Sequence, residues 1–239
     1  MNPFDRLSRL LLVPAAILPI CGGSTALAAP RPAVIELFTS QGCSSCPPAD
    51  ALLGELAQRP DTIALAFHVD YWDSLGWRDR FDLPLAAKRQ QRYVETLGLS
   101  SAFTPQIVVD GRRSFVGSDR TGITRSFGEI RNAVPVHAQV SDRTLVIELG
   151  SGAQETYDVC VVAVLPRAES HIGGGENSGK TLIDFNIVRG YLQLGTWRGA
   201  PARFEVPLSS LPADASKAAV LVQHQGQGEI AGATLVGLQ

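Results

Sequence analysis

The chain has 239 residues and is 45% hydrophobic, which is enough apolar content for one large buried core or two modest ones. Its formal net charge is -2 at pH 7, and its Lys and Arg residues form no local basic cluster, so nothing attracts it to nucleic acid or anionic lipid. We therefore expect a globular protein of one or two domains that does not bind nucleic acid.

Residues 1–28 have the pattern of an export signal. Arg6 and Arg9 precede an apolar stretch, LLLVPAAILPI, and Ala26-Leu27-Ala28 offers small residues for cleavage. Cleavage there predicts a periplasmic or secreted protein that begins near Ala29. Lipoprotein cleavage before Cys21 is the alternative, although the preceding Ile20 is bulky for it. The stretch is shorter than the roughly 20 residues that span a bilayer, and no later segment approaches that length, so we expect no membrane span.

Removal of the signal leaves Cys43, Cys46 and Cys160 in an oxidising compartment, where disulfides persist. The number is odd. A C-x-x-C pair with one further cysteine is more typical of a redox motif than of a disulfide scaffold.

The first elements predicted along the chain form a β-α-β unit. Residues 32–40 read as a buried strand that ends in a turn, and an amphipathic stripe from Ala49 to Ala57 predicts a helix that Pro60 ends. Residues 62–69 are almost continuously apolar, as in a parallel strand covered on both faces. This places Cys43 and Cys46 at the start of the helix.

The next elements complete a β-α-β-α-β-β-α order. A segment rich in aromatic and charged residues, 70–82, precedes a helix predicted over 84–97. Asp110-Gly111 joins two short strands as a hairpin, and Ser118 or Asp119 can cap a last helix that runs to Ala133.

The sequence pattern changes at Pro135. Short β-rich runs separated by Gly, Pro, Ser and Asp clusters predict seven or eight strands arranged as a β-sandwich. We therefore expect an α/β domain over residues 29–134 and an all-β sandwich-like domain over residues 135–239.

The C-x-x-C pair carries the predicted chemistry. Unpaired N–H groups at a helix start stabilise a thiolate, which predicts a reactive Cys43, and Cys46 is close enough to close a disulfide or to resolve a mixed one. Half of a zinc site has the same spacing, but the chain has no second C-x-x-C or H-x-H pair. A three-ligand metal site that includes His68 is the alternative.

The strings IELFTSQGCSSCPPAD, HVDYWDSLGW, FTPQIVVDG and GENSGKTL resemble a family of secreted bacterial thioredoxin-like proteins that is classed as a domain of unknown function. The resemblance covers essentially the whole mature chain. It implies a thioredoxin-like fold for residues 29–134, with a cis peptide bond before Pro105 and a Thr104 backbone that pairs with the substrate chain. An ordinary trans proline that begins a strand is the alternative.

The resemblance also implies a buried acid near the resolving cysteine, and Glu36 is the candidate. It lies seven residues before Cys43, one more than the usual spacing, so a structural ion pair is an equal alternative. Since the ends of parallel strands open onto one crevice, the segment after Val69 is expected beside the cysteines. Its candidate substrate-binding residues are Asp70, Tyr71, Trp72 and Trp77. The alternative is that these aromatic residues, like His68, only pack against the domain.

Two further signals are interpreted as structural. Gly174 and Gly179-Lys180-Thr181 formally match a phosphate-binding loop, but the match does not follow a strand tightly or open a helix, so we predict a Gly-rich loop of the sandwich. Cys160 lies in an apolar strand and is expected to be a buried, inert thiol.

The resulting functional hypothesis is thiol-disulfide exchange through Cys43 and Cys46, without a cofactor. The expected partners are protein thiols or disulfides and a redox partner protein. Binding of Cu(I) or Zn by the same pair, as in a metallochaperone, is the first alternative. The second is a partner-binding module in which the disulfide only staples a loop.

Overall fold

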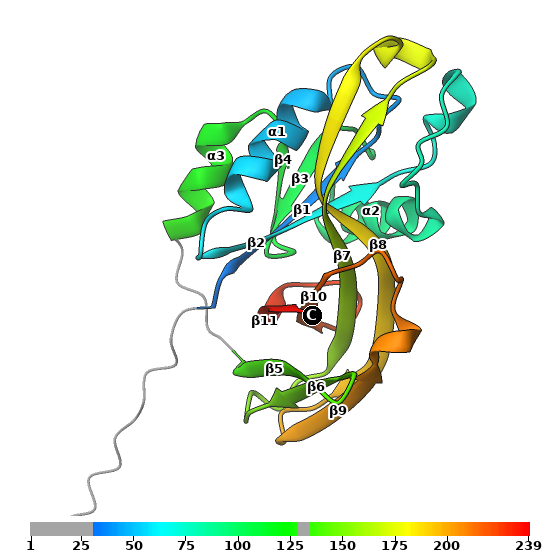
Figure 1. The fold of residues 1–239 in the computed structure, drawn as a ribbon. Helices are drawn as coiled ribbons and strands as arrows, with labels where there is room; N and C mark the ends of the chain where they lie inside the picture. The colour runs from blue at the N-terminus through cyan, green and yellow to red at the C-terminus, as the bar shows by residue number, and fades with distance from the viewer. Residues whose placement is uncertain (1–30, 129–133) are drawn as a thin grey trace, which may run out of the picture.

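The computed structural model describes residues 31–128 and 134–239, so the predicted export signal and Cys21 lie outside the described residues. Figure 1 shows two helical layers and a long sheet above a smaller sheet. The helices are α1 (Pro47–Leu56), α2 (Pro84–Thr96) and α3 (Arg120–Arg125). The strands are β1 (Ala33–Thr39), β2 (Thr62–His68), β3 (Gln106–Val109), β4 (Arg113–Val116), β5 (Val136–Ser141), β6 (Thr144–Leu149), β7 (Tyr157–His171), β8 (Thr181–Trp197), β9 (Ala202–Pro207), β10 (Lys217–His224) and β11 (Ile230–Gly237).

The elements predicted before residue 118 are present close to their predicted bounds. Every residue of β1 and β2 is buried, as the continuous apolar runs indicated, and Asp110-Gly111 forms the β3–β4 turn with both residues at positive φ. The last helix is shorter than predicted. The Asp119 side chain caps it by accepting the Gly122 N–H at 2.9 Å, but α3 ends at Arg125, and residues 129–133 of the prediction lie outside the described residues.

The topology overturns the predicted fold class. One mixed sheet of eight strands has the order β11-β10-β7-β8-β2-β1-β3-β4, and β5, β6 and β9 form a second sheet of three strands. β8 pairs with β2 through Ala66 and Ile187, so strands after Pro135 extend the sheet of the first half. The expected α/β thioredoxin-like domain followed by an all-β sandwich-like domain is therefore wrong. The described residues form a mostly β structure with three short helices. The domain boundary near Pro135 stays a prediction.

Strand length is the physical reason for this difference. β7 and β8 have 15 and 17 residues and pair with each other from Tyr157–Trp197 to His171–Thr181. Such strands are longer than the short runs assumed for a sandwich. The hairpin therefore pairs with β10 at its open end and extends beside α1 at its tip (Figure 1). Gly54 allows this contact, because a Cβ there would lie 2.6 Å from the Phe185 ring.

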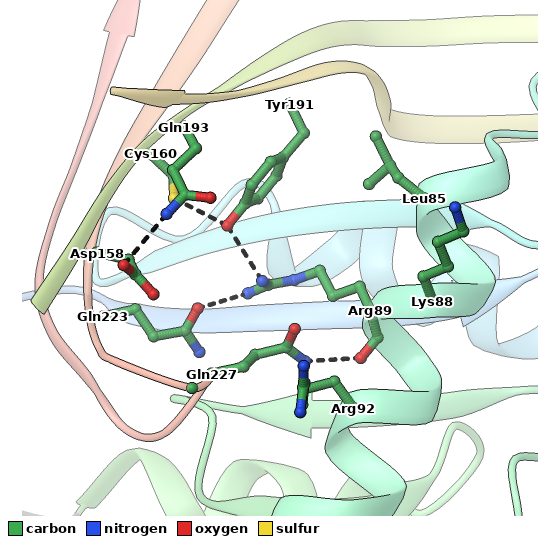
Figure 2. A pocket seen from close by; sticks show the side chains of 11 residues that line it. Leu85, Lys88, Arg89, Arg92, Asp158, Cys160, Tyr191, Gln193, Gln223 and Gln227 are labelled. Carbon is green, nitrogen blue, oxygen red and sulfur yellow. Dashed lines mark hydrogen bonds between the residues drawn. The ribbon is translucent and has the colours of Figure 1, made fainter. Parts of the chain in front are cut away.

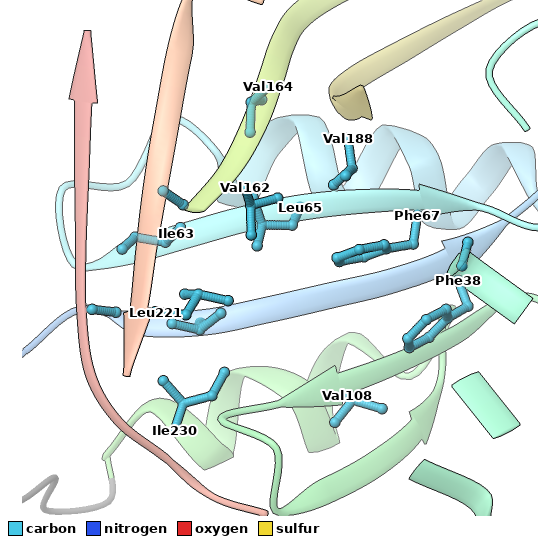
Figure 3. Close-up of a cluster of buried hydrophobic side chains, with 14 of the residues drawn as sticks. Phe38, Ile63, Leu65, Phe67, Val108, Val162, Val164, Val188, Leu221 and Ile230 are labelled. Carbon is cyan, nitrogen blue, oxygen red and sulfur yellow. The ribbon is translucent and has the colours of Figure 1, made fainter. Parts of the chain in front are cut away.

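Three apolar clusters hold the layers together. α1 and α3 cover one face of β1, β2 and β3. On the opposite face, α2 packs with β1 and β2, and Figure 3 shows Val162 and Leu221 from β7 and β10 in the same cluster. The three-stranded sheet packs against β7, β10 and β11. None of the helices within the two described ranges is long and apolar enough to cross a membrane.

A buried ion pair interrupts the α2-facing cluster. Glu36 of β1 accepts a hydrogen bond from Arg89 Nε of α2 at 2.6 Å, and Tyr93 donates to the same carboxylate at 2.5 Å. Arg89 and Glu36 side chains are 6% and 0% exposed. The pair is therefore costly to break, because either charge would be left in the core without compensation.

We predict that Arg89→Met lowers the free energy of unfolding by about 3–5 kcal/mol, because it leaves the Glu36 carboxylate buried and without its cation. Urea unfolding measures this directly. Arg92→Met is the matched control on the same helix, because its ion pair with Glu95 is more than half exposed and should contribute less than about 1 kcal/mol. Equal losses in the two variants would contradict the assignment.

Candidate functional site

Cys43 and Cys46 form a disulfide in the turn that leads into α1. Their Cα atoms are 5.4 Å apart, and both residues are buried, whereas Ser44 and Ser45 between them are exposed. Cys46, rather than Cys43, occupies the N-cap position, because α1 begins at Pro47. A proline is favourable at the first helical position, where the missing N–H would lack an intrahelical partner.

A loop from far along the chain covers this turn. It connects β7 to β8 over residues 172–180 and contains the short 3-10 helix η3 (Gly175–Asn177). The buried Asn177 side chain donates to the carbonyl oxygens of Gln41 at 2.9 Å and Cys43 at 3.0 Å. Glu176 Oε2 accepts the Ser44 N–H at 3.1 Å. The Gly-rich string that sequence analysis interpreted as a loop thus belongs to the candidate site.

Gln41 connects the turn with the rest of the molecule. It is 1% exposed, and both its backbone N–H and its side-chain amide are hydrogen-bonded to distant segments. A buried amide with all its groups paired rigidifies its surroundings. The side-chain partners of Gln41 are Ser170, Asp184 and Trp77, and its backbone partners are Asp79 and Asn177.

The predicted aromatic residues separate into two groups. Trp72 lies at the turn, where a Cβ on Gly42 would come within 3.0 Å of its Cβ, and its indole N–H donates to Thr104 Oγ1 at 2.9 Å. The indole N–H of Trp77 donates to Gln41 at 3.2 Å. Tyr71 donates to Gln90 of α2 and also interacts with Thr104, and the backbone carbonyl of Asp70 accepts the Asp73 N–H. The structure therefore brings Trp72, Trp77 and Thr104 to the turn.

Pro105 lies near the first turn of α1. The predicted cis bond between Thr104 and Pro105 is confirmed. Gly117 fits between Pro105 and Ala49, because a Cβ at that position would lie 2.8 Å and 2.7 Å from their Cβ atoms. Pro105 is thus close to the helix that Cys46 caps.

Glu36 does not join the site. It faces α2 in its ion pair with Arg89, which favours the structural alternative for this residue. Arg89 also borders a pocket of about 300 Å³ between α2 and β7, β8 and β10, where Figure 2 shows it donating to Tyr191 and Gln223. Cys160 lines the same pocket, and burial raises the pKa of its thiol, as expected for an inert cysteine.

The buried acid near the cysteines is Asp50, which sequence analysis missed. It lies in the first turn of α1, and its N–H donates to the Cys46 carbonyl at 3.1 Å. Burial raises the pKa of Asp50 from 3.8 to about 7, against the opposing attraction of the nearby His68. The position could have been noticed because an acid four residues after Cys46 interrupts the apolar face of the predicted helix.

Asp50 belongs to a buried cluster with His68, Asp79 and Asp184. His68 Nδ1 and Asp79 Oδ2 are 2.7 Å apart. Burial lowers the pKa of His68, but Asp79 and the other two carboxylates outweigh it and raise that pKa to about 9. His68 Nε2 has no hydrogen-bond partner in the part of the chain that the structure describes. Burial also raises the pKa of Asp184. The raised pKa values of Asp50 and His68 mean that the cluster holds protons near neutral pH.

A pocket of about 650 Å³ gives this cluster a route to the surface. α1 contributes Pro47, Asp50 and Ala51, and β8 contributes Leu182 and Phe185 to its lining. Asp50 therefore lies at the boundary between the buried cluster and an open groove that begins beside Cys46. No group of three or more His, Cys, Asp or Glu side chains suited to a metal ion occurs within residues 31–128 and 134–239.

We predict that the free energy of unfolding falls as pH rises, through Asp50 between about pH 4 and 7 and through His68 between about pH 6.5 and 9. The sign is the same for both, because each raised pKa means that the folded protein binds the proton more tightly than the unfolded chain does. Asp50→Asn should remove the first part of the fall, on the order of 2–4 kcal/mol.

Urea unfolding across this pH range measures the effect. Glu55→Gln is the matched control, because Glu55 is on the same helix but exposed and paired with Arg120. A constant difference between wild type and Asp50→Asn at every pH would contradict the prediction.

Comparison with known proteins places the chain in a family. No curated protein matches it. The crystal structure of protein AGR_C_4864 from Agrobacterium tumefaciens is similar, with 30% identity and a TM-score of 0.78 over 88% of this chain and 96% of that one. HBP35 of Porphyromonas gingivalis has a TM-score of 0.60 over 87% of this chain and 75% of that one, but 14% identity shows a likeness of fold alone. The model of a family described as "protein of unknown function (DUF1223)" matches residues 34–223, so the chain belongs to the DUF1223 family.

Proposed function

We propose that the protein exchanges dithiols and disulfides with protein substrates through Cys43 and Cys46. The observation that carries the proposal is a disulfide at the start of α1 with a carboxyl group of pKa about 7 one helical turn further on. An acid whose pKa lies near the working pH is suited to accept and return a thiol proton. The expected export to an oxidising compartment and the relation to the thioredoxin superfamily remain part of this proposal.

The exchange uses two displacement steps in the reducing direction. The Cys43 thiolate attacks one sulfur of a substrate disulfide, forms a mixed disulfide, and displaces the other substrate sulfur, which takes up a proton. Cys46 then loses its proton to Asp50 and attacks Cys43 Sγ. This restores the Cys43–Cys46 disulfide and releases the second substrate thiolate, which is protonated in turn. A partner protein with a dithiol supplies the two electrons and two protons that reopen the pair, and the oxidising direction is the reverse.

The surroundings of the turn suggest how a substrate chain approaches. Ser44 and Ser45 are exposed while both cysteines are buried, so the substrate must reach the sulfur atoms from the serine side. Trp72 lies against Gly42 of the turn and is hydrogen-bonded to Thr104. The half-buried Thr104 backbone is the proposed pairing site for an extended substrate segment.

We predict that Cys46→Ser accumulates a mixed disulfide through Cys43, because the resolving thiol is absent. Cys43→Ser should accumulate none through Cys46. The reaction of each variant with a disulfide-containing model protein is followed by mass spectrometry, in a chain where Cys21 and Cys160 are alanine so that no other thiol contributes. In the same background the intact pair should equilibrate with glutathione at a potential within about -270 to -120 mV.

Other outcomes favour the alternative functions. A pair that never opens in glutathione buffers supports a disulfide that only staples the turn. Stoichiometric Cu(I) or Zn on anaerobically purified protein, lost in either cysteine variant, supports a metal-binding role. Either result would contradict exchange as the function.

The role of Asp50 yields a separate prediction. Asp50→Asn should slow the resolving step about 100-fold above pH 7, because no base then accepts the Cys46 proton. The wild-type rate should show an inflection near pH 7 that the variant lacks. Stopped-flow measurement of mixed-disulfide decay tests this, with Glu55→Gln as the control, since Glu55 lines the same groove but is paired with Arg120. Unchanged pH profiles in both variants would remove Asp50 from the mechanism.

A further inference from the structure

Several donors that could stabilise a thiolate at Cys43 are missing or already engaged. Pro47 and Pro48 are the first two residues of α1, so the helix start lacks two of its usual N–H groups. The Cys46 N–H donates to the Cys43 carbonyl at 3.2 Å, and the Ser44 N–H is taken by Glu176. The Ser45 hydroxyl, 3.3 Å from Cys43 Sγ, is the contact that the structure gives to the sulfur.

Glu176 also adds a negative charge beside the turn. Its hydrogen bond from Ser44 lowers the pKa of its carboxyl group, so Glu176 is ionised at neutral pH. The loop holds it there, because the neighbouring Asn177 is buried and bonded to two carbonyl groups of the turn. Lys180 donates to Asn177 Oδ1 at 2.9 Å, so its ammonium group supports the loop.

The other ionisable groups packed against the turn do not favour a thiolate either. Asp50 on α1, Asp79 after β2 and Asp184 on β8 surround one cation, His68. With His68 protonated, this cluster carries no net positive charge when any of the three acids is ionised. Two further cations lie near these groups, but Lys180 is bonded to Asn177 and Arg80 acts on Asp184. A thiolate at Cys43 therefore faces cations that already have other partners, which is unlike the surroundings that make such cysteines strongly acidic.

We infer that Glu176 disfavours the thiolate of Cys43 and thereby sets the pair to act as a reductant of substrate disulfides. This inference rests on the proposed exchange function. Dithiol proteins become strong oxidants when their reduced form is stabilised, so an environment that withholds this stabilisation moves the equilibrium toward the disulfide. Electrons then flow from a partner dithiol to the pair and from the pair to the substrate disulfide, which ends as two thiols.

Glu176→Gln is the informative variant, because glutamine keeps an oxygen that accepts the Ser44 N–H but removes the charge. The pKa of Cys43 is read from the pH dependence of its alkylation rate in the reduced protein, with Cys21 and Cys160 replaced by alanine. We expect it to fall by about half a unit, as for one charge removed near the sulfur in water. The glutathione equilibrium should shift about threefold toward the reduced pair, and both shifts should shrink at high salt.

Glu169→Gln is the control, since Glu169 is an exposed carboxylate on the same hairpin that faces Arg167. It should leave both quantities unchanged. Equal values in wild type and Glu176→Gln, or a rise in the Cys43 pKa, would overturn the inference. The alkylation readout needs no substrate exchange. Failure of the pair to equilibrate with glutathione would therefore reject the proposed function separately from the effect of Glu176 on the thiol.

Discussion

The hydrogen bonds of Gln41 are the interaction on which the candidate site depends. This buried residue lies two positions before Cys43. Its side-chain amide bonds to β7 and β8, and its backbone bonds to the segment after β2 and to the β7–β8 loop. Loss of one of these partners would leave a buried polar group without a hydrogen bond, which lowers the free energy of unfolding. The hydrogen bonds therefore hold these segments in fixed positions relative to one another. Glu176 and Asn177 consequently sit over a turn that is more than 130 residues earlier in the chain.

The buried acids Glu36 and Asp50 lie on opposite faces of the large sheet. Glu36 has a structural role, and Asp50 has a proposed chemical one. Glu36 points toward α2, where Arg89 neutralises it and Tyr93 donates a hydrogen bond to it, while Arg89 itself also donates to Tyr191. Asp50 lies on the other side of the sheet, in a cluster where carboxylates outnumber the single imidazole. In the first arrangement the charge is fully paired within the core, whereas the second places a carboxyl group of raised pKa at the edge of an open groove.

The long β7–β8 hairpin explains why the second half of the chain takes part in the site. Residues 157–164 of β7 pair with β10. Nearer the tip of the hairpin, Phe185 of β8 packs on Gly54 of α1. The loop at its tip then reaches the cysteines. The second half of the chain therefore shares an apolar cluster with the first half. It also covers the cysteine turn with the β7–β8 loop and places the Glu176 carboxylate there.

Local sequence determined most of the elements and the cysteine turn, because apolar periodicity, Asp-Gly turns and prolines act over a few residues. The cis bond before Pro105 was expected from the family resemblance. Local sequence also marked Cys43 and Cys46 as a pair, and the structure joins them. The pairing of β8 with β2, the paired state of Glu36 and the burial of Asp50 were decided only by the tertiary structure. Each depends on which surfaces meet across more than a hundred residues or on opposite faces of a strand, and no local pattern encodes that choice.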